Sequence, residues 1–315
     1  MNEAGASRQR VLVVITGPTA SGKTALSVAV ARRLSCEIIS ADSRQLFRDL
    51  PIGTAAPSEE ELAAVPHHFI ATLGLDSYYS AAQYETDALA LLKDMWSAGE
   101  ASPFAVVCGG SMMYVDALVR GIDDMPTVSE TTRQYVRRLF SEHGLAGVMA
   151  QLEVLDPAYA AEVDAANTRR VMHALEICLQ SGRPYSELRI GQPKERPFKV
   201  LKFALDMPRE ELFDRINRRV DAMMAAGLEE EARRAFATAP EGANSLNTVG
   251  YRELKTYFDG GMDFATAVAR IAKNTRVYAK KQLTWLRRDP SVIWLPAGDD
   301  AADTIVRMAR EAVSD

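Results

Sequence analysis

The sequence predicts an α/β fold, a parallel sheet core with a helical insertion domain. Two observations lead to this prediction. Over the first 110 residues, short apolar and β-branched runs alternate with segments of helical periodicity. That order is typical of parallel strands joined by helices. From residue 127 to about residue 181 the pattern is helical throughout, so a helical segment interrupts the sheet-forming chain.

Each element is predicted from its periodicity. The run Val11–Ile15 is continuously apolar and is followed closely by a Gly-Pro pair, as expected of a strand buried on both faces. Residues 23–34 carry apolar side chains at four-residue spacing, as an amphipathic helix does. Further strands are expected at 36–40, 67–73, 104–108, 198–207 and 291–295, and further helices at 81–97, 209–226, 229–238, 249–258 and 264–286.

Glycine and proline mark the end of the helical segment, because five of them break the chain between residues 182 and 197. We therefore expect residues 1–120 and 196–315 to form the α/β core and residues 121–195 to form the insertion. At about 150 residues per domain, 315 residues suit a core with one insertion.

Composition excludes several classes of protein. Hydrophobic residues make up 47% and charged residues 25%, as in an ordinary globular protein. The apolar run near the start is far shorter than the roughly 20 residues of a membrane span, and the opening MNEAGASRQR lacks the apolar core of a signal peptide. Three widely spaced cysteines predict neither a disulfide framework nor a zinc site. We expect no membrane association and a cytoplasmic setting.

Charge gives two opposing indications about partners. The net charge of −5 argues against nucleic-acid binding. Residues 270–288, however, contain seven cations and no acid. On a helix, Lys273, Arg276, Lys280 and Arg287 share one face, and such a stripe can follow a phosphate backbone. A merely solvated helix face is the alternative.

A phosphate-binding loop follows the first strand. The sequence GPTASGKT matches G-x-x-x-x-G-K-[ST] between a strand and a helix, the context that this motif requires. Its backbone N–H groups and the helix N-terminus can hold an anion. Lys23 can reach outer phosphate oxygens, and Thr24 can bind Mg²⁺. The predicted diphosphate or nucleotide site comprises Gly17, Pro18, Thr19, Ala20, Ser21, Gly22, Lys23 and Thr24. The predicted core is therefore P-loop NTPase-like.

The aspartate that P-loop hydrolases place at the end of a second strand is missing where it is expected. The run at 104–108 ends in Gly109-Gly110, and the acid that follows a strand is Asp42. This pattern argues against a simple ATPase and leaves a kinase or a transferase that releases diphosphate. Asp42 stands at the carboxyl end of a strand, where open α/β sheets bind ligands. A helix N-cap is its structural alternative.

Seven ordered segments are similar to those of the bacterial tRNA dimethylallyltransferase family, also called tRNA isopentenyltransferases. The segments read GPTASGKT, ISADSRQ, IGTAAP, PHHFI, YSAAQY, GGSMMY and TRVYAKKQLTWLRR, and the resemblance runs from about Val11 to Leu295, nearly the whole chain. The resemblance implies transfer of a dimethylallyl group from dimethylallyl diphosphate to N6 of adenosine 37, in tRNAs that read codons starting with U. It implies Mg²⁺ as cofactor and the tRNA anticodon stem-loop as partner.

The resemblance also assigns roles to residues. Asp42 corresponds to the general base, Arg219 to an arginine on the diphosphate, and the stretch Ser43, Arg44 and Gln45 to residues that hold the adenine. With Lys23 and Thr24, Asp42 and Arg219 make up the implied catalytic set. Further implied tRNA contacts are Ser111, Arg133, Asn167, Thr168, Arg169, Arg170, Thr248, Gly250, Tyr251, Arg252, Lys280, Lys281, Gln282, Thr284, Trp285 and Arg287. The insertion is expected to grip the anticodon loop.

Two motifs depart from the family pattern. Ser111-Met112 replaces a Thr-Gly pair, and Ala56 replaces a lysine. Trp285 could stack on a base, although a buried core position is the more common use of tryptophan. The alternatives for function are prenylation of a free adenine nucleotide, a small-molecule P-loop kinase and a nucleotide-binding module without catalysis. We expect a monomer.

Overall fold

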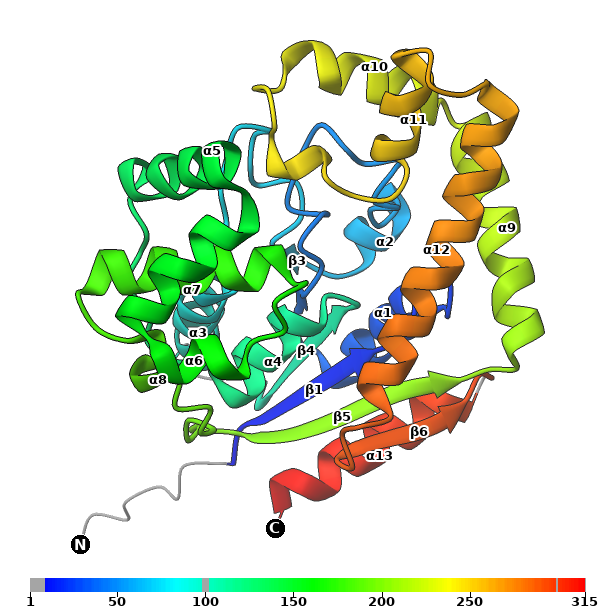
Figure 1. The fold of residues 1–315 in the computed structure, drawn as a ribbon. Helices are drawn as coiled ribbons and strands as arrows, with labels where there is room; N and C mark the ends of the chain where they lie inside the picture. The colour runs from blue at the N-terminus through cyan, green and yellow to red at the C-terminus, as the bar shows by residue number, and fades with distance from the viewer. Residues whose placement is uncertain (1–8, 98–101, 299, 315) are drawn as a thin grey trace, which may run out of the picture. The chain divides into compact units, whose positions relative to one another are not determined.

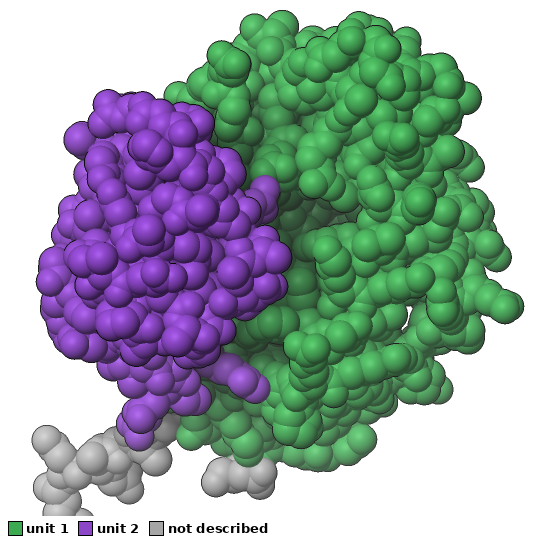
Figure 2. All heavy atoms as spheres, viewed as in Figure 1, with its two compact units in different colours: residues 1–119, 196–315 green, residues 120–195 purple. Residues whose placement is uncertain are grey.

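A computed structural model describes residues 9–97, 102–298 and 300–314. The opening MNEAGASRQR lies outside the described residues except for Gln9 and Arg10, so the expectation about a signal peptide concerns residues that are largely not described. The chain forms two compact units, one of residues 1–119 and 196–315 and one of residues 120–195, which Figure 2 colours separately.

The larger unit is built on a six-stranded parallel sheet with the strand order β3-β2-β4-β1-β5-β6 (Figure 1). The strands are β1 (Val11–Thr16), β2 (Ile38–Ser40), β3 (His67–His68), β4 (Phe104–Gly109), β5 (Lys199–Asp206) and β6 (Val292–Pro296). The α/β fold with a parallel sheet is thus confirmed. Thr16 pairs with Gly109, and Ser40 pairs with Cys108. The carboxyl ends of β1, β2 and β4 therefore meet at one edge of the sheet.

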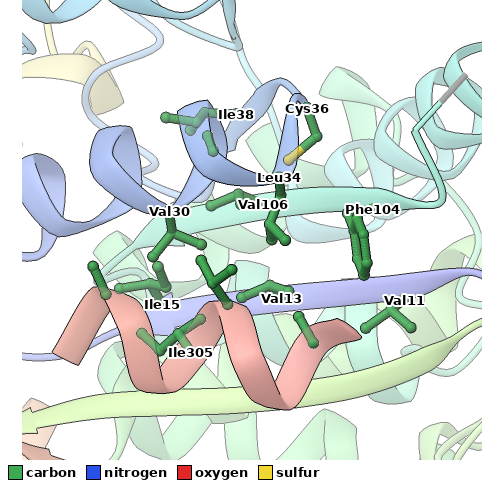
Figure 3. Close-up of a cluster of buried hydrophobic side chains, with 14 of the residues drawn as sticks. Val11, Val13, Ile15, Val30, Leu34, Cys36, Ile38, Phe104, Val106 and Ile305 are labelled. Atoms are coloured by element: carbon green, nitrogen blue, oxygen red, sulfur yellow. The ribbon is translucent and has the colours of Figure 1, made fainter. Parts of the chain in front are cut away.

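Helices cover both faces of the sheet, which explains why β1 is continuously apolar. Val11, Val13 and Ile15 pack with α1 (Lys23–Leu34) and α13 (Asp300–Ser314), as Figure 3 shows. The alternate residues Leu12 and Val14 pack on the other face with α3 (Ala81–Ser97) and α4 (Met112–Arg120). A strand with two buried faces has no need of polar positions.

The remaining helices of this unit follow β5 in the chain, except α2 (Glu59–Ala64). They are α9 (Arg209–Ala225), α10 (Leu228–Thr238), the 3₁₀ turn η1 (Asn244–Leu246), α11 (Tyr251–Phe258) and α12 (Phe264–Leu286). Helices α9 and α12 lie side by side (Figure 1) and share the buried side chains Leu212, Ile216 and Ala279. Helices α10, α11 and α12 enclose a separate apolar cluster that includes Leu228, Leu254 and Ile271.

The smaller unit is helical. It contains α5 (Glu130–Leu155), α6 (Pro157–Glu162), α7 (Thr168–Ser181) and α8 (Tyr185–Leu188). Val136, Leu152, Val171 and Leu175 form its own buried core. Non-helical backbone at Gly144 kinks α5.

Two expectations about secondary structure were wrong or incomplete. The strand expected at 67–73 ends after His68, because Phe69 and Ala71 take φ angles of +61° and +53°, which turn the chain out of the sheet. Helices α2, α4 and α13 were not predicted, although α13 carries apolar residues at helical spacing. Among the described residues, no helix is both long and apolar enough to span a membrane.

Candidate active site and nucleic-acid interface

The phosphate-binding loop connects β1 to α1. Gly22 caps α1 with φ +92°, a left-handed conformation that favours glycine. The N–H groups of Gly22, Lys23 and Thr24 at this helix end carry no hydrogen bond among the described residues. The Ser21 hydroxyl is also buried without a described partner. Several neighbouring donors therefore have no acceptor among the described residues, as expected of an anion site.

Cationic side chains surround this loop. Burial holds the pKa of the Lys23 ammonium below its ordinary value of 10.5, and the charge of Arg219 lowers it further, while Cys108 and Asp42 oppose the shift. Burial likewise lowers the pKa of the Arg219 guanidinium, and Asp42 opposes it. Desolvated cations of this kind are stabilised when an anion binds between them. Lys23, Arg219 and Asp42 thus lie within electrostatic reach of one another.

Arg215 is a further cation beside the loop, and sequence reasoning missed it. Its Nη1 lies 3.6 Å from the position that a Cβ on Gly22 would occupy. Arg215 and Arg219 are four residues apart on α9, so they share one face of that helix. This spacing was visible in the sequence and could have identified Arg215.

Asp42 occupies a turn rather than a helix N-cap, since a turn and no helix follows it. Its Oδ1 accepts a 2.9 Å hydrogen bond from the Arg44 N–H. No hydrogen bond reaches Oδ2 among the described residues, so one carboxylate oxygen is available to a substrate. The helix N-cap expected as the structural alternative is therefore not present, and the turn occupies only Oδ1.

Residues near Asp42 hold one another in place. The Ser111 hydroxyl accepts the Ser43 N–H at 2.8 Å and lies 3.1 Å from the Ser43 hydroxyl. The serine that replaces threonine at position 111 therefore keeps a hydroxyl contact to this turn. Arg44 donates to the backbone oxygen of Asn244 at 2.6 Å.

The side-chain amide of Gln45 forms hydrogen bonds within the protein. Its Oε1 accepts from the Ser40 hydroxyl at 3.2 Å, and its Nε2 donates to the oxygen of Ala55 at 3.0 Å. An adenine could use this amide only in exchange for these bonds. The loop at 52–55 is held from the opposite side by Glu231, whose carboxylate accepts the N–H groups of Ile52 and Gly53, each at 2.8 Å. Sequence reasoning missed Glu231, because an acid among three glutamates on a helix gives no local signal.

Two residues predicted to touch tRNA are buried in the protein. The Tyr251 ring is fully buried, and its hydroxyl donates to Glu231 at 2.5 Å. Gln282 is 2% exposed. Its Oε1 accepts the Thr19 N–H at 3.1 Å, and its Nε2 donates to the Gly110 oxygen at 2.8 Å. The polar groups of both side chains form hydrogen bonds within the protein. Neither prediction of a tRNA contact therefore agrees with the structure.

The cationic stretch, residues 270–288, forms most of α12 and the two residues after it. Lys273, Lys280 and Arg287 are exposed there as predicted, but Arg276 is part-buried and donates to Asn217 at 2.5 Å. Trp285 is 36% exposed and is not a core residue. A pocket of about 350 Å³ is lined by Met112, Val277, Lys280, Lys281, Thr284, Trp285 and Arg288. Cations beside an accessible aromatic ring suit a phosphate backbone with unstacked bases.

A second, larger pocket of about 660 Å³ lies between the end of α10 and α11. Arg252 and Lys255 on α11 are exposed and contribute its positive charge, and Glu241 and Asn247 add polar groups. Thr248 and Gly250 stand in the turn that leads to Arg252, where Gly250 has φ +102°. This pocket holds part of the predicted tRNA segment.

The smaller unit carries the remaining predicted residues. Asn167 caps α7 by accepting the Arg170 N–H, and Thr168 is the first residue of that helix. Arg169 and Arg170 are exposed, and Arg133 on α5 is part-buried. The two arginines on α7 remain candidates for contact with phosphate.

Thr24 is the residue of the phosphate-binding loop that could hold a metal ion. The described residues contain no group of three or more His, Cys, Asp and Glu side chains that could hold an ion. The Thr24 hydroxyl makes no hydrogen bond among them and can bind a hard cation. Mg²⁺ commonly keeps waters and takes substrate phosphates as ligands, so Thr24 with a diphosphate fits such an ion.

Fold and site together define a P-loop protein whose cradle suits a diphosphate. The model of the family described as IPP transferase matches residues 45–289. The chain belongs to this family, which confirms the resemblance found in the sequence. It is 50% identical over 283 residues to tRNA dimethylallyltransferase 2 of Parabacteroides distasonis, covering 90% of this chain and 93% of that protein. It is 49% identical to tRNA dimethylallyltransferase 1 of Bacteroides fragilis, with the same coverages.

Solved structures agree with the fold. The full-length tRNA isopentenylpyrophosphate transferase of Bacillus halodurans matches with a TM-score of 0.68 and 32% identity, covering 97% of this chain and 96% of that one. A eukaryotic dimethylallyltransferase solved acting on tRNA matches with a TM-score of 0.79 at 24% identity, covering 97% and 78%. This second likeness concerns the fold alone.

Proposed function

We propose that this protein transfers the dimethylallyl group of dimethylallyl diphosphate to N6 of adenosine 37 in tRNAs that read codons starting with U. The observation that carries the proposal is the juxtaposition of Asp42 with Lys23 and Arg219 at the free N–H groups of α1. A base and an anion cradle within reach of each other suit displacement of diphosphate by an amine.

The charges fit this displacement. Negative charge grows on the departing diphosphate, and donors fixed at that end stabilise it. Lys23, Arg215 and Arg219 supply cations there, and the α1 N-terminus supplies N–H groups. Mg²⁺ bound to Thr24 and the diphosphate would neutralise part of the same charge. No P-loop side chain has to change protonation state in this step.

Asp42 accepts the proton of the amine. An exocyclic amine of adenine becomes acidic only as its bond to carbon forms, so an ordinary carboxylate is a sufficient acceptor. The oxygen free of the Arg44 N–H is the one that can take this proton. The adenine must leave its stack to reach it.

RNA is favoured over a free nucleotide as the prenyl acceptor. Lys280, Lys281 and Arg288 line a pocket beside the accessible ring of Trp285, an arrangement that suits a phosphate backbone with unstacked bases. Arg169 and Arg170 on the smaller unit and Arg252 on α11 add positive charge for an anticodon stem-loop. A kinase is disfavoured, since β4 ends in Gly109-Gly110 and provides no aspartate for a metal–triphosphate complex.

The test uses the purified protein with Mg²⁺ and labelled dimethylallyl diphosphate. One acceptor is an anticodon stem-loop with adenosines at 36 to 38, and its matched control has guanosine at 37. AMP is the third acceptor. We expect label only on the first RNA. Label on AMP alone, or on both RNAs equally, would refute the proposal. Light scattering of the same preparation tests the expected monomer.

A further inference from the structure

Gln282 joins two parts of the larger unit that are far apart in the chain. It lies on α12, whose neighbouring side chains Lys280 and Lys281 form the cationic pocket. Its amide points the other way and is 2% exposed. There it bonds to the N–H of Thr19 in the phosphate loop and to the oxygen of Gly110 after β4.

This contact removes a donor from the anion cradle. Pro18 has no N–H, and the Ser21 N–H is turned back to the Pro18 oxygen at 3.3 Å. With the Thr19 N–H donated to Gln282, the loop N–H groups that carry no hydrogen bond among the described residues include those of Ala20, Gly22, Lys23 and Thr24. The Gln282 contact therefore leaves the donors at the N-terminal end of α1 for an anion.

The absence of a side chain at Gly110 leaves room for the Gln282 amide. A Cβ at this position would lie 2.4 Å from the Gln282 Nε2, a distance that real Cβ atoms do not show. The glycine therefore admits the amide between β4 and the loop. This gives a physical reason for glycine at a position where a hydrolase would be expected to carry its metal-binding acid.

We propose that Gln282 is a positioning residue of the diphosphate site, which fixes the phosphate loop to the RNA-facing helix α12 and reserves the Thr19 amide. The inference deepens the proposed function and rests on it for the role of α12. Because Gln282 bonds the loop to the helix that carries Lys280 and Lys281, we expect RNA on the helix and diphosphate on the loop to stabilise each other. Occupation of one site then raises affinity at the other.

The test compares Gln282→Met, which keeps the length of the side chain but loses both hydrogen bonds, with Gln83→Ala, which removes an exposed amide on α3. Inorganic pyrophosphate binding is measured by calorimetry, and stem-loop binding by fluorescence anisotropy with and without pyrophosphate. For Gln282→Met we expect pyrophosphate affinity to fall about three- to tenfold, the scale of one lost hydrogen bond, because the loop loses the Thr19–Gln282 bond that positions its remaining donors. RNA affinity without pyrophosphate should stay within about twofold of the wild type, and the mutual enhancement should vanish.

Three results would overturn the inference. One is wild-type pyrophosphate affinity in Gln282→Met. The side chain would then only fill space between α12 and the loop, and its hydrogen bonds would not position the loop. Another is a loss of RNA affinity equal to that of pyrophosphate, which would make Gln282 an RNA contact. The third is the absence of mutual enhancement in the wild type. If Gln282→Met fails to fold, Gly110→Ala displaces the same amide and must reproduce the loss of pyrophosphate affinity. Pyrophosphate binding does not require prenyl transfer, so a wild type that binds it without modifying RNA would refute only the proposed function.

Discussion

The hydroxyl of Tyr251 donates a 2.5 Å hydrogen bond to the buried carboxylate of Glu231. The same carboxylate receives the N–H groups of Ile52 and Gly53, while Gln45 holds the next two residues of that loop by their oxygens. Burial, followed by the charge of Glu231, raises the pKa of the Tyr251 hydroxyl, so the phenol stays a donor. Helices α10 and α11 are thereby tied to the turn that carries Asp42.

Glu231→Gln tests the contribution of these hydrogen bonds to stability. One carboxylate oxygen would be replaced by an NH₂ group that faces a donor, so a buried N–H or hydroxyl loses its acceptor. We expect the free energy of unfolding to fall by about 1–3 kcal/mol, measured by urea denaturation. Glu229→Gln, which removes a surface pair with Arg233 on the same helix, is the control and should cost less than about 1 kcal/mol. Equal losses in the two variants would contradict the role of Glu231.

Periodicity predicted some elements to the residue and others not at all. The ranges 23–34, 81–97 and 264–286 agree with α1, α3 and α12, because each helix has an apolar face that a local pattern reveals. The strand expected at 67–73 could not be corrected from the sequence, since its end is set by left-handed backbone at Phe69 and Ala71. No local pattern specifies that conformation for those residue types.

The candidate site likewise contains residues whose role the sequence predicted and residues whose role it did not. The phosphate loop and Asp42 were predicted because a motif and a strand end mark them. Tyr251 and Gln282 were assigned to tRNA because they stand in segments that resemble tRNA-contact segments. Which side of a helix faces the protein depends on its packing partners, here Glu231 and the phosphate loop. Segment resemblance therefore located the site but could not sort its residues into those that face RNA and those that support them.

Lys202 and Asp289 form a nearly buried ion pair at 2.5 Å between β5 and the residues after α12. Burial disfavours the charged form of Asp289, but hydrogen bonds from Lys202 and Ser291 outweigh it and lower its pKa to about 2. A carboxyl whose pKa is depressed in the folded state contributes stability above its unfolded value of 3.8, and that contribution is lost as pH falls toward 2.

Lys202→Met should reduce this pH dependence and destabilise the protein at pH 7 by about 3–5 kcal/mol, the usual cost of a buried charge that has lost its partner. Urea midpoints measured between pH 6 and pH 3 should fall less steeply in the variant than in the wild type. Arg33→Met, which breaks an exposed pair with Asp303, should leave the slope as it is. Parallel curves for wild type and Lys202→Met would contradict the assignment.

Asp42→Asn separates the two roles of Asp42, which are to hold the turn through the Arg44 N–H and to accept the proton of the amine. Asparagine can still accept the Arg44 N–H, so the turn persists, but its amide cannot take the proton from the amine. We expect the prenylation rate to fall by about 10²-fold or more, with stem-loop affinity within about twofold of the wild type. Asp42→Ala should lose the rate and also loosen the turn. A wild-type rate in Asp42→Asn would exclude the residue as the base.

Lys280→Ala with Lys281→Ala tests the cationic pocket on α12. If both lysines neutralise phosphates, the slope of log affinity for the stem-loop against log salt should become shallower by about 1.4–1.8, or about 0.7–0.9 for each contact. Anisotropy titrations at four salt concentrations measure it. The control removes two exposed cations elsewhere, with Arg32→Ala and Arg307→Ala. A slope equal to that of the control would mean that the stripe is a solvated helix face.

The protons taken up when pyrophosphate binds should show whether Lys23 contacts the diphosphate. Its pKa lies below 10.5 in the free protein because burial disfavours the ammonium, whereas a bound diphosphate favours the ammonium and raises the pKa again. Over the pH range just below 10.5, pyrophosphate binding should therefore be accompanied by proton uptake, and affinity should fall as pH rises. Calorimetry in two buffers of different ionisation enthalpy measures the protons taken up. Lys23→Met should bind pyrophosphate more weakly and without this uptake. The same uptake in Lys23→Met would show that another group is responsible.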